Sequence, residues 1–297
     1  MDDNGEMSAF LGDTWAALHH VRPAWAAVAV ALYAVSVLMV AARWRLVLRA
    51  LGGRPGLGEL SLTHLAAICV NNVTPASRLS GEAVRVGVVT RRGLAPVTQA
   101  TASVVIDRLS EVPPVVALFL IALPAVGASL PPVSPRAMLA VGGGLLLLVG
   151  VVAWRKPGLE RLRAVGRSVT IPRSQFLVAV GWSAALWVQD VLRLMAAAAS
   201  CGVLLTPPRA ALLAATAIVT GLVPSIGGLG VVEGGMVGAL MMSGVDGPTA
   251  AAITAVERAI SYGLATLAGG GALVALGGRA LWTTAPARDV VARSAGE

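Results

Sequence analysis

The feature that most constrains how this chain can fold is a pattern that occurs twice. In each copy, a break rich in proline and glycine precedes a glutamate, and an acid–arginine pair follows inside an apolar stretch. Asp107-Arg108 begins 25 residues after Glu82, and Glu257-Arg258 begins 24 residues after Glu233. Broken helices and intramembrane charges in corresponding halves are typical of a transport path, provided that the chain lies in a membrane. The breaks contain Pro75 and Gly81 in the first copy, and Pro224, Gly227, Gly228 and Gly230 in the second.

The composition predicts a membrane protein. Of 297 residues, 56% are hydrophobic and 13% are charged, and the mean hydropathy is +0.79. A soluble domain carries about 25% charged residues. Several uncharged runs approach or exceed the ~20 residues that cross a bilayer. These runs cover 23–42, 112–135, 137–154, 210–232 and 259–278. We therefore predict an all-α, polytopic membrane protein.

Metal, cofactor and nucleic-acid functions find no support in the residue pattern. The two cysteines, Cys69 and Cys201, are too few for a metal site, and the three histidines show no ligand spacing. The net charge of +8 comes from cations that stand beside apolar runs. We expect no metal, no cofactor and no nucleic-acid partner.

Charge asymmetry predicts the topology. Basic residues gather at 43–54, 155–173 and 279–293, and the positive-inside rule places these regions in the cytoplasm. The N-terminus carries four acids where a signal peptide would be basic, so it is predicted outside. Spans are expected at about 24–48, 96–127, 136–154, 174–200 and 249–278. Residues 1–22 form a polar N-terminal segment, 23–280 the integral transport domain of the cell (inner or plasma) membrane, and 281–297 a cytoplasmic tail.

Two apolar segments, 58–93 and 207–247, are interrupted near the middle by proline and glycine. Each is predicted to be a re-entrant helical hairpin, and the alternative is a pair of full spans. With the flanking spans, they form two units of about 24–127 and 174–278, joined by the span 136–154. Because the first spans run in opposite directions, the units form an inverted repeat. Arg49 is the expected counterpart of Arg193.

The first copy of the pattern suits an anion. Arg78 and Arg85 stand on either side of the helix start, and guanidinium groups bind phosphate well. Glycine at the break leaves backbone amides free near a helix N-terminus, which favours anions further. The alternative is that Glu82 and Arg85, three residues apart on one helix face, only pair at the water interface.

The second copy requires a partner for Glu233, and Arg258 is the obvious candidate. Packing of small residues explains the glycine run nearly as well as a ligand loop does. Asp107-Arg108 and Glu257-Arg258 are either structural ion pairs that lock a hairpin to a span, or halves of a headgroup site. Asp190 and Arg193 are expected to form a third pair.

These residues also resemble a known family. Asn71-Asn72-Val73-Thr74-Pro75 through Arg78, Gly81-Glu82, Arg85 and Asp107-Arg108 are similar to the first signature of the flippase-like family, which includes the transmembrane domain of lysylphosphatidylglycerol synthases. Val223-Pro224, the glycines 227–230, Glu233 and Glu257-Arg258 resemble its second signature. Ser225-Ile226 departs from the common Pro-x-Pro-Gly-Gly form. The synthases add a soluble aminoacyl-transferase domain, which this sequence lacks.

The resemblance implies translocation of an anionic or aminoacylated phospholipid, or of a polyprenyl-phosphate-linked sugar. We therefore predict a lipid translocase that is not an enzyme. One alternative is a non-transporting scaffold with a glycosyltransferase or synthase partner in a cell-envelope complex. The other is an intramembrane enzyme that acts on lipid phosphates. The predicted headgroup-binding residues are Arg78, Glu82, Arg85, Asp107, Arg108, Glu233, Glu257 and Arg258.

Overall fold

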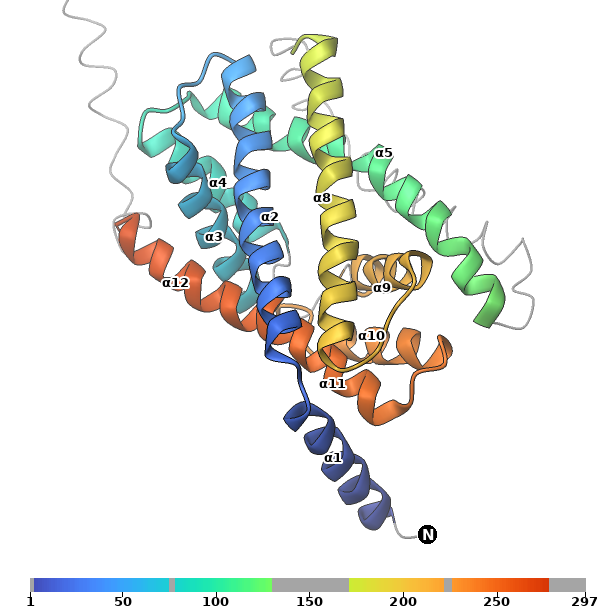
Figure 1. The fold of residues 1–297 in the computed structure, drawn as a ribbon. Helices are drawn as coiled ribbons and strands as arrows, with labels where there is room; N and C mark the ends of the chain where they lie inside the picture. Colours follow the sequence, from blue (N-terminus) through green and yellow to red (C-terminus); the bar gives the residue numbers. More distant parts are fainter. Residues whose placement is uncertain (1–2, 75–77, 130–170, 222–225, 278–297) are drawn as a thin grey trace, which may run out of the picture.

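The computed structural model describes residues 3–74, 78–129, 171–221 and 226–277. The described residues form helices and no strands, which confirms the all-α class (Figure 1). The predicted span 136–154, the tail 281–297, Pro75 and Pro224 lie outside this part of the chain. The helices are α1 (Asp3–His19), α2 (Pro23–Ala50), α3 (Leu57–Val73), α4 (Arg78–Arg91), α5 (Val97–Ser129), α8 (Arg173–Ser200), α9 (Pro207–Thr220), α10 (Val231–Met242), α11 (Gly247–Arg258), the π-helix η1 (Ala259–Leu264) and α12 (Ala265–Ala275).

The helix order of the first half returns in the second half at the same spacing. Helices α2 and α8 each have 28 residues and begin 150 residues apart (173 − 23). The starts of α3 and α9 (207 − 57) and of α5 and α11 (247 − 97) also differ by 150. Gly52 and Gly202 follow α2 and α8 with φ of 88° and 84°, a conformation that glycine adopts without strain. Glycine therefore ends both long helices in the same way.

Helices α2 and α8 pack side by side in opposite directions (Figure 1). At one end, the Arg22 N–H donates to the carbonyl of Ser200 over 2.7 Å. Toward the other end, Arg43 Nη1 donates to Ser183 Oγ over 2.7 Å. The start of α2 thus lies at the end of α8. Of the described helices, these two are long and apolar enough to cross a membrane.

Each predicted hairpin is a pair of short helices. Helices α3 and α4 have 17 and 14 residues, and α9 and α10 have 14 and 12. All four are shorter than the ~20 residues that cross a bilayer at full thickness. Prolines at the start of α9, where an N–H would be unpaired in any case, favour its initiation there.

The first helix of each hairpin packs against the last helix of the other half. Helix α3 lies against α12, and α9 lies against α5. The α3–α12 contact depends on Gly269, because a Cβ there would stand 2.7 Å from the Cβ of Cys69. Leu118 and Ala122 of α5 share one buried cluster with Ala210 and Leu213 of α9. The two halves are therefore interlocked and do not form separate bundles.

The N-terminal segment, predicted only as polar, is the helix α1. It lies against α11, where Phe10 approaches Gly247. Met7, Leu11 and Trp15 are more than half exposed. Their spacing places them along one side of α1. The acidic residues of the same segment are the reason that the sequence predicts it only as polar.

Candidate functional site

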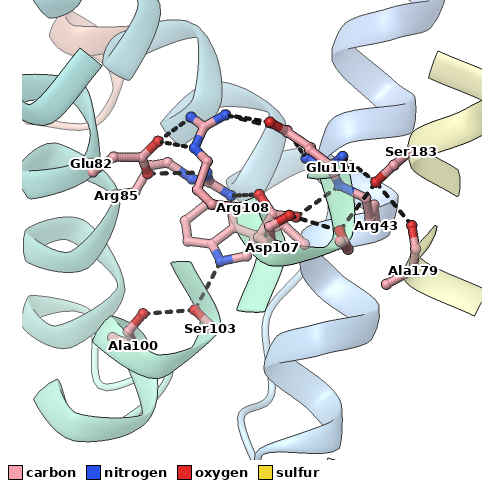
Figure 2. A network of polar contacts seen from close by, with 12 residues as sticks. Arg43, Glu82, Arg85, Ala100, Ser103, Asp107, Arg108, Glu111, Ala179 and Ser183 are labelled. Carbon is pink, nitrogen blue, oxygen red and sulfur yellow. Dashed lines mark hydrogen bonds and ion pairs between the residues drawn. The ribbon is translucent and has the colours of Figure 1, made fainter. Parts of the chain in front are cut away.

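Six charged side chains from α2, α4 and α5 meet in one network (Figure 2), which we call the first cluster. Asp107 of α5 lies at its centre and is fully buried. Its Oδ1 accepts from Arg43 Nε over 2.8 Å, and its Oδ2 accepts from Arg85 Nη2 over 2.9 Å. Both arginines are buried as well. The members of the first cluster are Arg43, Glu82, Arg85, Asp107, Arg108 and Glu111.

Arg108 lies at the exposed edge of the first cluster. Its side chain is 40% exposed, and it forms ion pairs with Glu82 of α4 and Glu111 of its own helix. Glu82 also accepts from Arg85 Nη1 over 3.1 Å. Arg108 therefore holds α4 against α5, and it is the most exposed cation of this network.

Apolar and hydroxyl side chains orient the buried arginines. The guanidinium of Arg85 stacks over the ring of Trp44 at 4.0 Å from the centroid, a favourable cation–π arrangement. Trp44 in turn donates from Nε1 to Ser103 Oγ over 3.0 Å. Arg43 reaches across to Ser183 of α8. The position of each cation is thus set by packing as well as by charge.

The second half holds two groups of ion pairs, made by α8, α10 and α11, which together we call the second cluster. Arg193 of α8 is paired with Glu257 of α11 and, over 3.2 Å, with Asp190 of its own helix. Ser261 Oγ donates to the other oxygen of Glu257 over 2.9 Å. The members of the second cluster are Asp190, Arg193, Glu233, Glu257 and Arg258.

Arg258 connects α11 to the start of α10. Its Nε donates to Glu233 over 2.7 Å, and its Nη2 donates to the carbonyl of Gly227 over 2.9 Å. The second oxygen of Glu233 accepts from the Gly230 N–H over 2.7 Å and so caps α10. Gly230 has φ of 82°, and Gly227 has φ of 60°. The glycine run thus shapes a tight turn around the guanidinium of Arg258.

Two ion pairs of the first cluster have counterparts in the second cluster. Arg43 precedes Asp107 by 64 residues, and Arg193 precedes Glu257 by the same 64. Arg108 follows Glu82 by 26 residues, and Arg258 follows Glu233 by 25. In each half, the acid of the acid–arginine pair binds an arginine of the long first helix. The arginine of that pair binds the glutamate of the hairpin.

Each acid–arginine pair is followed by a feature that disturbs helix hydrogen bonding. Pro113 and Pro114 in α5 remove the N–H groups that would bind the carbonyls of Leu109 and Ser110. After Arg258, the chain forms the π-helix η1. One-turn π segments are frequent at functional sites because they alter the hydrogen bonding of the helix. Both halves therefore combine a charged pair with disturbed helix hydrogen bonding.

Asn72, at the end of α3, links the two halves near the hairpin turns. Its Nδ2 donates to Thr266 Oγ1 over 2.8 Å, and its backbone carbonyl accepts from the hydroxyl of Tyr262 over 3.2 Å. Arg258 lies over the Tyr262 ring at 4.8 Å from the centroid. A Cβ at Gly227 would approach the Asn72 carbonyl to 2.7 Å. The turn of one hairpin thus lies close to the end of a helix in the other.

The predicted ion pairs are present: Glu82 with Arg85, Glu233 with Arg258, and Asp190 with Arg193. The side chain of Arg78 lies outside the described residues. Two residues outside the predicted site also belong to the first cluster: Arg43, predicted as a cytoplasmic flanking charge, and Glu111. Arg49, predicted as the counterpart of Arg193, is exposed. Arg43 and Arg193 each stand 64 residues before the acid that they bind, a shared spacing that becomes recognisable once the pairs are known.

The described residues contain no group of three or more histidine, cysteine, aspartate or glutamate side chains that could hold a metal ion. The candidate site consists of arginines paired with carboxylates. Its arginines could exchange a carboxylate for another oxyanion, because both groups accept the same forked hydrogen bonds.

Comparison with known proteins places these observations in a family. Residues 8–269 match the family described as the lysylphosphatidylglycerol synthase TM region. This range includes both clusters. The chain is also similar to a UPF0104 membrane protein of Methanothermobacter thermautotrophicus. The two are 25% identical over a 289-residue alignment that covers 84% of this chain and 85% of the relative.

Proposed function

Because this chain belongs to the family of lysylphosphatidylglycerol synthase transmembrane regions, and is thus a membrane protein, we propose that it moves an anionic lipid headgroup between leaflets. The observation that supports this most is the presence of two corresponding clusters, one in each half. Each cluster ties a hairpin to a longer helical segment through an arginine. The substrate is an anionic or aminoacylated phospholipid or a polyprenyl-phosphate-linked sugar, and no bond is made or broken.

The proposed step is an exchange of ion-pair partners. A headgroup phosphate approaches Arg108, the most exposed cation of the first cluster, and displaces Glu82 or Glu111. Since Glu82 is on α4 and Arg108 on α5, this exchange loosens the hairpin from the helix. The equivalent exchange at Arg258 displaces Glu233 and frees the start of α10. The lipid tail remains in the bilayer throughout.

The antiparallel α2 and α8, with matched helices after each, support an inverted repeat. In this proposal α3–α4 and α9–α10 are re-entrant hairpins, the first entering from the cytoplasm and the second from outside. The chain is a multi-pass protein of the plasma membrane, with its N-terminus outside. Each cluster then serves one leaflet.

The test is the rate at which an anionic fluorescent lipid becomes accessible to a membrane-impermeant quencher in proteoliposomes. The wild type should exceed protein-free liposomes, and folded Arg258→Ala, Arg78→Ala and Glu233→Gln variants should fall well below the wild type. Wild-type rates in all three folded variants would remove the proposed path.

A second candidate, a non-transporting scaffold for a cell-envelope enzyme, is favoured by one observation. Each arginine of the two clusters is already paired with a carboxylate of the same protein. A scaffold should tolerate the double substitution Glu82→Gln with Arg108→Gln, because one cation and one carboxylate are removed together and the remaining two arginines and two carboxylates stay paired. A translocase should lose activity, since the exposed cation is removed.

A further inference from the structure

The two clusters differ in their charge balance. The first contains three arginines and three carboxylates and is neutral. The second contains two arginines and three carboxylates, which gives 2 − 3 = −1. The missing cation can be located, because Arg85 stands three residues after Glu82, whereas Met236 stands three residues after Glu233. Met236 is uncharged and buried, so the second cluster has no cation at the position that corresponds to Arg85.

The unbalanced carboxylate is Asp190. In the first cluster, each oxygen of its three carboxylates accepts at least one hydrogen bond from an arginine. Glu233 and Glu257 also have both oxygens bonded. Asp190 accepts only at Oδ1, over 3.2 and 3.3 Å from Arg193, and its Oδ2 accepts no bond among the described residues.

The other charged groups around Asp190 do not neutralise the excess negative charge of the second cluster. Arg193 of the same helix is shared with Glu257 of α11. Tyr33 of α2 faces Arg193 with its ring, at 6.0 Å. The carboxylates of Glu257 and of Glu111 on α5 both repel a charge on Asp190. Helix α9 contributes only Arg209, which is exposed at its start.

We propose that Asp190 is a proton-binding site of this protein. An unmatched charge at membrane depth costs a few kcal/mol, and one proton removes it. Hydronium transfers a proton to Asp190 Oδ2, an O–H bond forms and water remains. The second cluster then has two arginines and two carboxylates and is neutral, like the first. The side chain is 34% exposed, which gives this oxygen access for the exchange.

The role of this proton in transport rests on the proposed function. When the second cluster binds a headgroup phosphate, its charge becomes more negative, so binding of the anion favours binding of the proton. By linkage, the proton favours the anion to the same extent. Asp190 therefore couples lipid movement to proton uptake at this cluster.

Infrared titration of the protein in phosphatidylcholine nanodiscs tests the site without any transport assay. As the pH is lowered, the wild type should gain a carboxylic-acid band that Asp190→Asn lacks. Asp246→Asn is the matched control. Asp246 caps α11 by accepting from the Thr249 N–H over 3.0 Å and belongs to neither cluster. Asparagine also caps helices well, so this variant should fold and keep the band. A band that persists in Asp190→Asn, or is absent from the wild type, overturns the proposal.

Transport of fluorescent phosphatidylglycerol under a pH gradient then tests the coupling. The gradient should change the wild-type rate severalfold and leave the rate of Asp190→Asn unchanged. Equal responses of both proteins overturn the coupling. If the band depends on Asp190 but the wild type transports no lipid, the proton site stands and the proposed function fails. If lipid is transported but no such band appears, the proposed function stands and the proton site fails.

Discussion

At the residue scale, Asp107 is the carboxylate on which the first cluster depends most. It is fully buried and compensates Arg43 and Arg85, which are buried too. Removing one partner of a buried ion pair leaves an uncompensated charge, at a cost of about 3–5 kcal/mol. Asp107→Asn should therefore lower the free energy of unfolding by that order, measured by thermal or denaturant unfolding in detergent.

Glu59→Gln is the control for this substitution. Glu59 is paired with Arg92 over 2.9 Å, and both side chains are partly exposed. Exposed pairs contribute about 0–1 kcal/mol, so the control should be nearly neutral. Equal destabilisation by the two variants would show that Asp107 does not hold the network together.

For single residues, the sequence predicted some ion pairs correctly and failed to predict others. An intramembrane acid needs a partner, and this requirement predicted the pair Glu233–Arg258, while the three-residue spacing on one helix predicted Asp190–Arg193. It could not reveal the pairing of Arg43 with Asp107, because these two residues are 64 positions apart and are brought together only by the packing of α2 on α5. A basic residue near the end of an apolar run has the same appearance whether it flanks the membrane or enters a buried cluster.

At the element scale, the contact of α3 with α12 makes a sharp prediction about two adjacent glycines. A Cβ at Gly269 would meet the backbone and side chains of α3, whereas a Cβ at Gly270 would meet nothing within 4 Å. Gly269→Ala should destabilise the protein by about 1–3 kcal/mol through overpacking. Gly270→Ala should stabilise it by about 0.4–1 kcal/mol, because alanine restricts the unfolded chain.

Unfolding of both variants in the same detergent measures this difference. The opposite order of stability, or no difference, would mean that α12 does not pack against α3 through Gly269. The sequence alone could not separate these two residues, since both belong to the run Gly269-Gly270-Gly271. Hydrophobic runs and breaks did predict the helix pairs α3–α4 and α9–α10, because proline and glycine mark helix ends irrespective of packing.

At the scale of the whole molecule, the proposed inverted repeat predicts the sides on which two equivalent connections lie. Arg54 follows α2 and Leu204 follows α8, 150 residues later (204 − 54), and both are exposed. In a background with Cys69→Ala and Cys201→Ser, a membrane-impermeant maleimide should label Leu204→Cys in intact cells. It should label Arg54→Cys only after permeabilisation. Labelling of both from the same side would contradict an inverted arrangement.

If both clusters belong to one path, as we propose, the two arginines that bind the hairpins should both be needed for translocation. Arg108→Gln and Arg258→Gln each remove a cation that would bind phosphate. Charged hydrogen bonds contribute about 1.5–3 kcal/mol, so each change should slow headgroup translocation in proteoliposomes about tenfold or more. Arg92→Gln removes an arginine of the Glu59 pair outside both clusters and should keep the wild-type rate. A rate that falls for only one cluster, or that falls equally for Arg92→Gln, would contradict a path through both.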